Sequence, residues 1–214
     1  MRIDWNRYRS FVYGTWEPDV VRTLAKLVSP GDAVLDIGAH IGFYTLLLAR
    51  LVGPKGQVVA FEPLPGNFEI LAENIRLNQC SQVRAINKAV MGSGGKLEVT
   101  LSQDEPLPGG TSMLNDHGGQ QVAVDAVSLD EFFGSARVPL SLIKMDVEGA
   151  EEQVLRGGRK TIESLHPTLV IEVHHFDCQR EEHPVLALLR DWHYELRWVN
   201  RWALTSHLVA QWKA

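Results

Sequence analysis

Apolar residues along this chain follow two patterns that alternate with each other. Short runs that are almost wholly apolar, such as 33–37 and 168–173, are typical of strands buried on both faces of a sheet. Between such runs, stretches such as 65–77 repeat apolar residues at helical spacing. This alternation favours an α/β fold of the doubly wound, Rossmann-like kind, with a mostly parallel sheet and helices on both faces. The other expected strands cover 57–61, 83–90, 96–101, 121–127 and 140–147, followed by a closing antiparallel pair at 194–199 and 203–212.

The length of 214 residues predicts a single domain, 1–214. Residues 1–30 read as an N-terminal helical arm, whose helix begins at Pro18. Residues 102–120 are rich in Gly, Pro, Asp and Ser, and we expect a substrate or lid loop there, with Thr111 and Ser112 as polar contacts. A solvated hairpin tip is an equally good interpretation of this loop.

Composition narrows the classes of function and partner. Hydrophobic residues make up 45% of the chain, yet no apolar run is long enough to span a membrane, so no membrane partner is expected. The formal net charge of -5 disfavours general nucleic-acid binding. Residues 1–10 lack the apolar segment of a secretory signal, and Cys80 and Cys178 lack metal or redox spacing, so we expect free thiols in the cytoplasm. Four tryptophans are expected in the core or at the seam of a homodimer, with sugar binding as an alternative: Trp192, Trp198, Trp202 and Trp212.

Residues 34–45, VLDIGAHIGFYT, read as a buried strand, a tight turn and the start of a helix. Gly38 has no Cβ, so a ligand can approach its backbone closely, and Gly42 falls where the helix begins. The spacing D-x-G-x-x-x-G differs from the dinucleotide pattern G-x-G-x-x-G, and the carboxylate of Asp36 would repel a pyrophosphate. The turn therefore suits a ligand with a cationic end, such as S-adenosylmethionine (SAM), with a nicotinamide site or a ligand-free turn as alternatives.

Acidic residues and histidines close four of the expected strands. Glu62 follows the second strand about 20 residues after the glycine turn, where nucleotide-binding folds present a carboxylate to the ribose hydroxyls, although a solvated strand end is the plainer interpretation. Because the carboxyl ends of parallel strands share one edge of a sheet, we expect all four groups to meet there. They are Asp36, Glu62, Asp146 with Glu148, and Glu172 with His174 and His175.

With these motifs, the chain resembles the FkbM family of SAM-dependent methyltransferases over about residues 16–173. The residues that carry the resemblance are 16–18 (WEP), 34–45, 61–63 (FEP), Asn74, Asn78, 88–90 (KAV) and 143–151 (IKMDVEGAE). The resemblance implies a seven-stranded SAM-binding fold and, most often, methyl transfer to a hydroxyl of a sugar or natural product. The closing strands and residues 102–120 match least, and they would choose the acceptor. The expected SAM-binding residues are Glu17, Asp36, Gly38, His40, Gly42, Phe43, Glu62, Pro63, Asn67, Ala89 and Asp146.

Methyl transfer to a hydroxyl requires alignment and removal of a proton. We expect His174 to be the base and Asp146 to orient the acceptor or the methionine ammonium, with Glu172 beside them on the face of the strand that carries His174. His175 and His40 are the runners-up for the base. The remaining histidines are expected at the surface or as helix caps: His117, His166, His183 and His207.

Three alternatives stay open. The donors Asp146, Glu148, Glu172 and His174 could hold a divalent metal, although none is expected and a network of hydrogen-bonded carboxylates is the plainer interpretation. N-methylation is open because a neutral amine needs less help from a base. A nicotinamide-dependent oxidoreductase is disfavoured by Asp36 and by the missing third glycine, and the polar strand ends disfavour a non-catalytic SAM-binding protein or scaffold.

Overall fold

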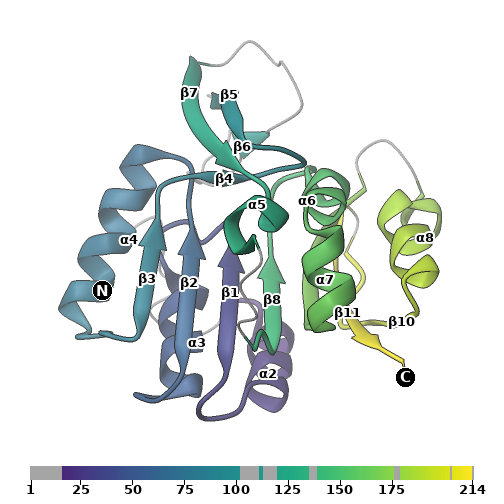
Figure 1. Cartoon of the computed structure of the whole chain (residues 1–214), viewed down its shortest axis with the longest axis horizontal. Helices are drawn as coiled ribbons and strands as arrows, with labels where there is room; N and C mark the ends of the chain where they lie inside the picture. Colours follow the sequence, from purple (N-terminus) through teal and green to yellow (C-terminus); the bar gives the residue numbers. More distant parts are fainter. Residues whose placement is uncertain are drawn as a thin grey trace.

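The computed structural model of the chain describes residues 16–101, 111–112, 120–134, 139–175, 179–202 and 204–213. Within these residues the main sheet has seven strands in the order β10-β11-β9-β8-β1-β2-β3 (Figure 1). They are β1 (Ala33–Ile37), β2 (Gln57–Phe61), β3 (Val83–Ile86), β8 (Leu142–Met145), β9 (Thr168–His174), β10 (Tyr194–Trp198) and β11 (Thr205–Trp212). Strands β3, β2, β1, β8 and β9 are parallel, whereas β11 is antiparallel to both β9 and β10. The predicted α/β sheet with its C-terminal antiparallel pair is confirmed.

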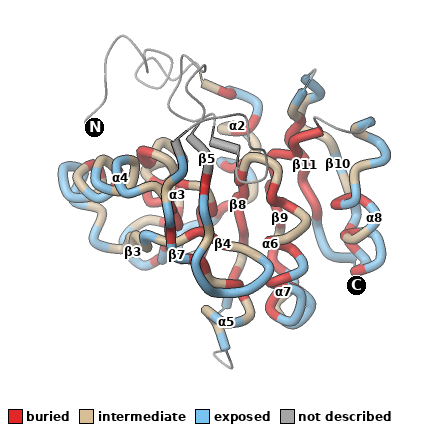
Figure 2. Tube along the Cα trace, turned by 90° about the horizontal axis from the view of Figure 1, so that it is seen from above, coloured by how far each residue is buried: buried red, intermediate tan, exposed pale blue. Residues whose placement is uncertain are grey.

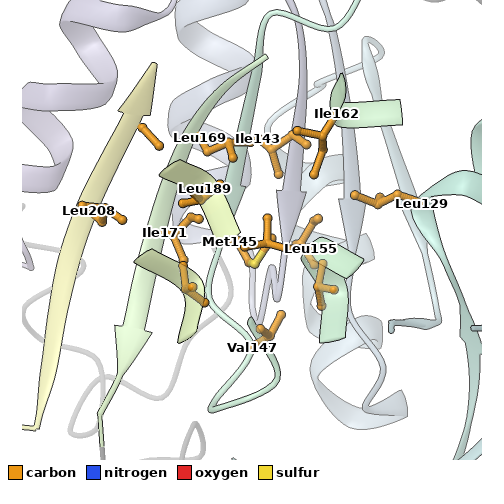
Figure 3. Packing of buried hydrophobic residues seen from close by; sticks show 14 of the residues in the cluster. Leu129, Ile143, Met145, Val147, Leu155, Ile162, Leu169, Ile171, Leu189 and Leu208 are labelled. Atoms are coloured by element: carbon orange, nitrogen blue, oxygen red, sulfur yellow. The ribbon is translucent and has the colours of Figure 1, made fainter. Parts of the chain in front are cut away.

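Helices cover both faces of this sheet. On one face, Val20, Leu24 and Leu48 pack against Val34 and Val170 of the strands, so the helix of the predicted N-terminal arm belongs to the core. On the other face, apolar side chains of four helices surround those of β8 and β9 (Figure 3). The first layer contains α2 (Pro18–Leu27) and α3 (Phe43–Val52), and the second contains α5 (Leu129–Phe133), α6 (Glu151–Gly157), α7 (Arg159–Leu165) and α8 (Pro184–Asp191).

The buried residues follow the strands. Figure 2 shows them concentrated in the strands, while α4 (Pro65–Leu77), α7 and α8 expose their outer sides. The short 3-10 helix η1 (Arg180–Glu182) precedes α8. In the part of the chain that the structure describes, no helix combines the length and apolar character needed to cross a bilayer.

Side-chain alternation places a row of polar residues on the face covered by α2 and α3. In β1, Leu35 and Ile37 join the core of the opposite face, while Asp36 accepts a hydrogen bond from Thr45 of α3. Strand pairing sets Asp36 beside Lys144 of β8. Farther along the sheet, β9 and β11 pair Glu172 with His207. The row therefore crosses the point between β1 and β8 where the strand order reverses, which is where open α/β sheets bind ligands.

A second, four-stranded sheet was not predicted. Its order is β4-β7-β5-β6, formed by β4 (Ala89–Val90), β5 (Gly95–Leu101), β6 (Thr111–Ser112) and β7 (Gln120–Val127). It lies beyond the carboxyl ends of β1, β2, β3 and β8 (Figure 1). Most of the predicted loop 102–120, and the side chains of Thr111 and Ser112, lie outside the described residues.

Two predicted elements are divided in the structure. The single strand expected at 83–90 ends at Ile86, because Asn87 Nδ2 donates to the carbonyls of Glu62 and Pro63 at 2.8 and 2.9 Å and the chain turns into β4. The helix expected around 155–162 is two helices, because Asp130 accepts from the amide nitrogens that open α7. Both divisions arise from side-chain to backbone hydrogen bonds across the fold, which periodicity does not reveal.

Candidate functional site

The glycine turn packs directly against the end of β8. Gly38 has a φ of 79°, and a Cβ built on it would lie 1.7 Å from the carbonyl oxygen of Asp146. The amides of Gly38 and Ala39 donate to the carbonyl of Phe61 at 3.0 and 2.9 Å. The turn is thus held between the ends of β2 and β8, and Gly42, with a φ of 96°, leads from it into α3. Among the expected site residues, the structure brings together Gly38, Asp146 and the residues after β2.

Glu62 faces this turn as predicted. Its Oε2 accepts from the amide of His40 at 2.8 Å, and its Oε1 accepts from the amide of Leu64 at 3.0 Å and from Asn67 Nδ2 at 3.4 Å. Burial raises the pKa of Glu62 to about 7, against the opposing effect of these donors. Each carboxylate oxygen has two lone pairs, so Glu62 keeps capacity to accept from a ligand hydroxyl. Pro63 is buried next to it.

Two expected SAM-binding residues have no exposed surface. Asp36 is completely buried beneath the turn, where Thr45 Oγ1 donates to its Oδ2 at 2.6 Å. Burial raises the pKa of Asp36, partly offset by Lys144. Ala89 is completely buried among Val99, Val124 and other side chains of the small sheet. The burial of Ala89 and Asp36 weighs against their direct contact with a ligand, and their SAM-binding roles stay predictions.

Lys144 is a buried cation for which the sequence predicted no role. Its side chain is 2% exposed, and its Nζ lies 3.4 Å from Asp146 Oδ2 and 4.6 Å from the centre of the Tyr44 ring. Burial would lower the pKa of Lys144, but Asp146, Asp36 and further carboxylates raise it. The ammonium lowers the pKa of Asp146 despite burial, so Asp146 stays ionised. The signal available in the sequence was one lysine inside the otherwise apolar strand 142–145.

His174 is enclosed by carboxylates. Its Nδ1 lies 2.6 Å from Glu151 Oε1, and its Nε2 lies 3.3 Å from Glu148 Oε2. Burial would lower the pKa of His174, but these two partners and nearby Asp146 raise it to about 11. An imidazolium has no lone pair to receive a proton. This raised pKa weighs against a base role, and the assignment of His174 as the general base stays a prediction.

The predicted metal donors divide into two groups. Asp146, Glu148 and His174 have ligand atoms within 4.8 Å of one another, whereas Glu172 belongs to a separate group with Glu17 and His207. Glu172 and Asp146 influence each other electrostatically across the two groups. Burial, and then the charges of Asp146 and Glu17, raise the pKa of Glu172.

His207 was expected at the surface, but it is completely buried. Its Nε2 lies 3.4 Å from Glu17 Oε2 and 3.5 Å from Glu172 Oε2. Tyr44 donates a short hydrogen bond to Glu17, which lies before α2 with a φ of 40°. Glu17 Oε2 thus contacts both Tyr44 of α3 and His207 of β11. His207 stands in the apolar run of β11, and that position was the signal for burial.

The other histidines take varied positions. His175 is buried with its Nε2 3.2 Å from Ser206 Oγ, and the amide of His40 is engaged with Glu62. His183 caps α8 as predicted, by accepting from the amide of Val185 at 3.3 Å, and exposed His166 stacks on Trp212. His117 and Cys178 lie outside the described residues, and Cys80 is a free cysteine. Trp192 is in the core, whereas Trp202 and Trp212 are exposed.

Comparisons with known proteins identify the family and the fold of this chain. The family model described as Methyltransferase FkbM domain matches residues 36–196. Hexuronic acid methyltransferase AglP of Haloferax volcanii is 30% identical over 162 residues, covering 74% of this chain and 62% of AglP. The 31-O-demethyl-FK506 methyltransferase FkbM of Streptomyces tacrolimicus is 29% identical over 197 residues, covering 75% of this chain and 72% of that protein. This chain therefore spans less than two thirds of the length of AglP.

Among solved structures, methyltransferase FkbM from Methylobacillus flagellatus has a TM-score of 0.58 to this chain at 18% identity. The match covers 92% of this chain and 51% of that structure. At this identity the likeness concerns the fold alone.

Proposed function

Because this chain belongs to the FkbM family of methyltransferases, we propose that it transfers the methyl group of SAM to a hydroxyl group of a sugar or natural-product small molecule. The observation that carries the proposal is the glycine turn, where Gly38 lies against the Asp146 carbonyl with the Glu62 carboxylate alongside. Cytoplasmic location and a homodimer stay predictions.

The residues at this edge fit the charges of SAM. The side chain of Asp146 is 27% exposed at this edge, and its Oδ1 has no hydrogen-bond partner among the described residues, so the ionised carboxylate can accept from the methionine ammonium. Glu62 can accept from the ribose hydroxyls, with Asn67 and the His40 amide fixing its position. A side chain at position 38 would fill the space between turn and strand that these contacts require. When bound, SAM supplies a methyl group on a positively charged sulfur, which an acceptor oxygen displaces in line.

The proton of the acceptor hydroxyl must pass to a basic group that does not already hold one. The raised pKa of His174 favours its protonated form, and burial raises the pKa of Glu172 as well. Glu148 is the member of the His174 group with the most open side chain, at 33% exposure, and its Oε2 is held by His174 Nε2. We propose that the carboxylate of Glu148 accepts this proton and that His174 holds that carboxylate in position. This assignment requires no metal.

The relatives support a hydroxyl as the acceptor. The name of AglP describes methylation of a hexuronic acid, and that of the Streptomyces FkbM describes methylation of an oxygen of FK506. Both are hydroxylated small molecules, and we extend that acceptor class to this chain. The particular acceptor would be chosen by the small sheet and the C-terminal strands, which flank the edge of the main sheet.

The first test is ligand binding followed by thermal unfolding. S-adenosylhomocysteine should raise the melting temperature with increasing concentration, because a ligand that binds only the folded state stabilises it, and NAD should not. Stabilisation by NAD alone would contradict the proposal. Incubation with SAM and a panel of hexuronic acids and polyhydroxylated natural products should then give a product heavier by one methylene group. Products methylated only on amines would replace O-methylation with N-methylation.

A further inference from the structure

A second polar cluster lies beside the proposed methyl-donor site, and the proposed function does not use it. It consists of Glu17 before α2, Glu172 of β9 and His207 of β11, which we call the Glu17 cluster. The three residues come from distant parts of the sequence, and all three are buried. Strand pairing places Glu172 directly opposite His207, and Glu17 approaches from the layer formed by α2 and α3.

The atoms of this cluster converge as ligands of an ion do. His207 Nε2 is buried and has no hydrogen-bond partner among the residues that the structure describes, yet it lies 3.4 and 3.5 Å from the facing oxygens of Glu17 and Glu172. The three ligand atoms lie within 4.8 Å of one another. A tetrahedral ion bonded at about 2.0–2.2 Å separates its ligands by about 3.3–3.6 Å, which agrees with both measured distances.

The surroundings hold these side chains in place. Asn200 Oδ1 accepts from the amide of His207 at 2.8 Å, and Nδ2 and Oδ1 of Asn200 lie 3.2 and 3.4 Å from His207 Nδ1. In the tautomer that carries its proton on Nδ1, directed at Asn200 Oδ1, the lone pair of Nε2 faces the two carboxylates, which is how outer residues orient a metal-binding histidine. Tyr44 donates to the Glu17 oxygen that faces His207, and the edge of the Trp202 ring lies over His207 at a centroid distance of 5.5 Å.

The local charge balance also favours a cation. Near the Glu17 cluster, the carboxylates of Asp36 and Asp146 are close to the buried ammonium of Lys144, and Lys144 is directly paired with Asp146. Among the described residues, Glu17 and Glu172 have no lysine or arginine within ion-pair distance; their close cationic partner is His207, and burying carboxylates without enough cation is costly. From these observations we propose that Glu17, Glu172 and His207 bind one divalent transition-metal ion, with zinc as the best fit to two carboxylates and an imidazole.

Such an ion would tie three parts of the fold together. It would join the segment before α2 and strand β11 to the end of β9, where Glu172 acts electrostatically on Asp146. Because the ligands are nearly closed to solvent, the ion's role is structural, and it positions Glu172 beside the methyl-donor site. The inference rests on the geometry of these three residues, not on the proposed methyl transfer.

The test uses the full chain without an affinity tag, stripped with a chelator and then exposed to Zn²⁺. After desalting, elemental analysis should find one zinc per chain, and titration against a chromogenic chelator gives the dissociation constant. His207→Gln and Glu17→Gln should weaken zinc binding by about a hundredfold or more, while His174→Gln, in the neighbouring group of carboxylates, should retain it. Circular dichroism establishes that each variant is folded.

Two results would overturn the proposal. The first is a wild-type chain that retains no stoichiometric zinc, which would mean that a protonated His207 balances the two carboxylates without metal; this measurement requires no variant to fold. The second is zinc lost from His174→Gln but kept by His207→Gln, which would place the ion among Asp146, Glu148 and His174. Neither result bears on whether S-adenosylhomocysteine binds, so the two proposals fail separately.

Discussion

Glu62 shows how one residue can have the correct position and an unexpected state. The carboxylate lies where the sequence placed it, after β2 and beside the glycine turn. Its surroundings remove water, and this raises its pKa to about 7 although three donors favour the ionised form. Sequence spacing identified the acid, but it could not reveal the donors, because they come from the turn and from α4.

The state of Glu62 predicts a pH dependence of ligand binding. The ionised carboxylate is the better acceptor for ribose hydroxyls. Ligand affinity should therefore rise with pH by up to about tenfold per pH unit below pH 7, and it should level off above about pH 7. Calorimetry with 5′-methylthioadenosine, which has the ribose and lacks the amino acid, measures this directly. Glu62→Gln should bind weakly at every pH, and Glu69→Gln, on the exposed side of α4, should behave as wild type. A wild-type affinity independent of pH would contradict the ribose role.

At the scale of elements, the glycine turn is a packing junction as well as a ligand site. Gly38 is required less for its positive φ than for the approach of the Asp146 carbonyl, since the space for a side chain is already occupied by backbone. Gly31 offers a comparison: its φ of 94° is also positive, but a Cβ there would meet nothing within 4 Å. Comparing substitutions at Gly31 and Gly38 therefore distinguishes the cost of backbone strain from the cost of a steric clash.

Alanine substitution at these two glycines should have unequal costs. Gly31→Ala should lower the free energy of unfolding by about 1–2 kcal/mol, the cost of a left-handed backbone for a residue with a Cβ. Gly38→Ala should cost more than about 3 kcal/mol, because β8 and the turn must also move apart. Urea unfolding measures both, and S-adenosylhomocysteine should stabilise Gly31→Ala but not Gly38→Ala. Equal costs would show that Gly38 is present for its φ alone.

The elements that the sequence predicted well are those with a local cause. Strands β1 and β2 and helix α4 have their expected bounds, because apolar runs and periodicity determine them, and Ser128 caps α5 through a complete capping box. The small sheet was missed, because its strands pair across residues far apart in the sequence. The buried position of His207 was missed for the same reason, since its partners Glu17 and Glu172 come from other elements. The local pattern of apolar residues predicts helices and strands, whereas the pairing of charged side chains depends on how the strands assemble into the sheet.

At the scale of the whole molecule, Lys144 links the parts of the polar row. Its ammonium interacts with Asp36 of β1, Asp146 after β8, Glu172 of β9 and Glu17 before α2. Most of this charge is buried between the sheet and the layer of α2 and α3, where interactions are weakly screened by salt. The same ammonium keeps Asp146 ionised, which is the state in which Asp146 can accept from a ligand ammonium.

Replacing Lys144 should therefore affect the fold and one end of the ligand. Lys144→Met leaves several buried carboxylates without their cation and should lower the free energy of unfolding by about 3–5 kcal/mol, whereas Lys26→Met, on the exposed side of α2, should change it by less than about 0.5 kcal/mol. Without this cation, Asp146 would tend to be protonated and would lose its charge-assisted hydrogen bond to the methionine ammonium. That loss should weaken the binding free energy by about 1.5–3 kcal/mol, which raises Kd at least about tenfold. Calorimetry at a temperature where the variant is folded should show that loss for S-adenosylhomocysteine, while 5′-methylthioadenosine, which ends at the sulfur, keeps its affinity. If both ligands weaken equally, Lys144 supports the sheet and has no part in holding the amino-acid end.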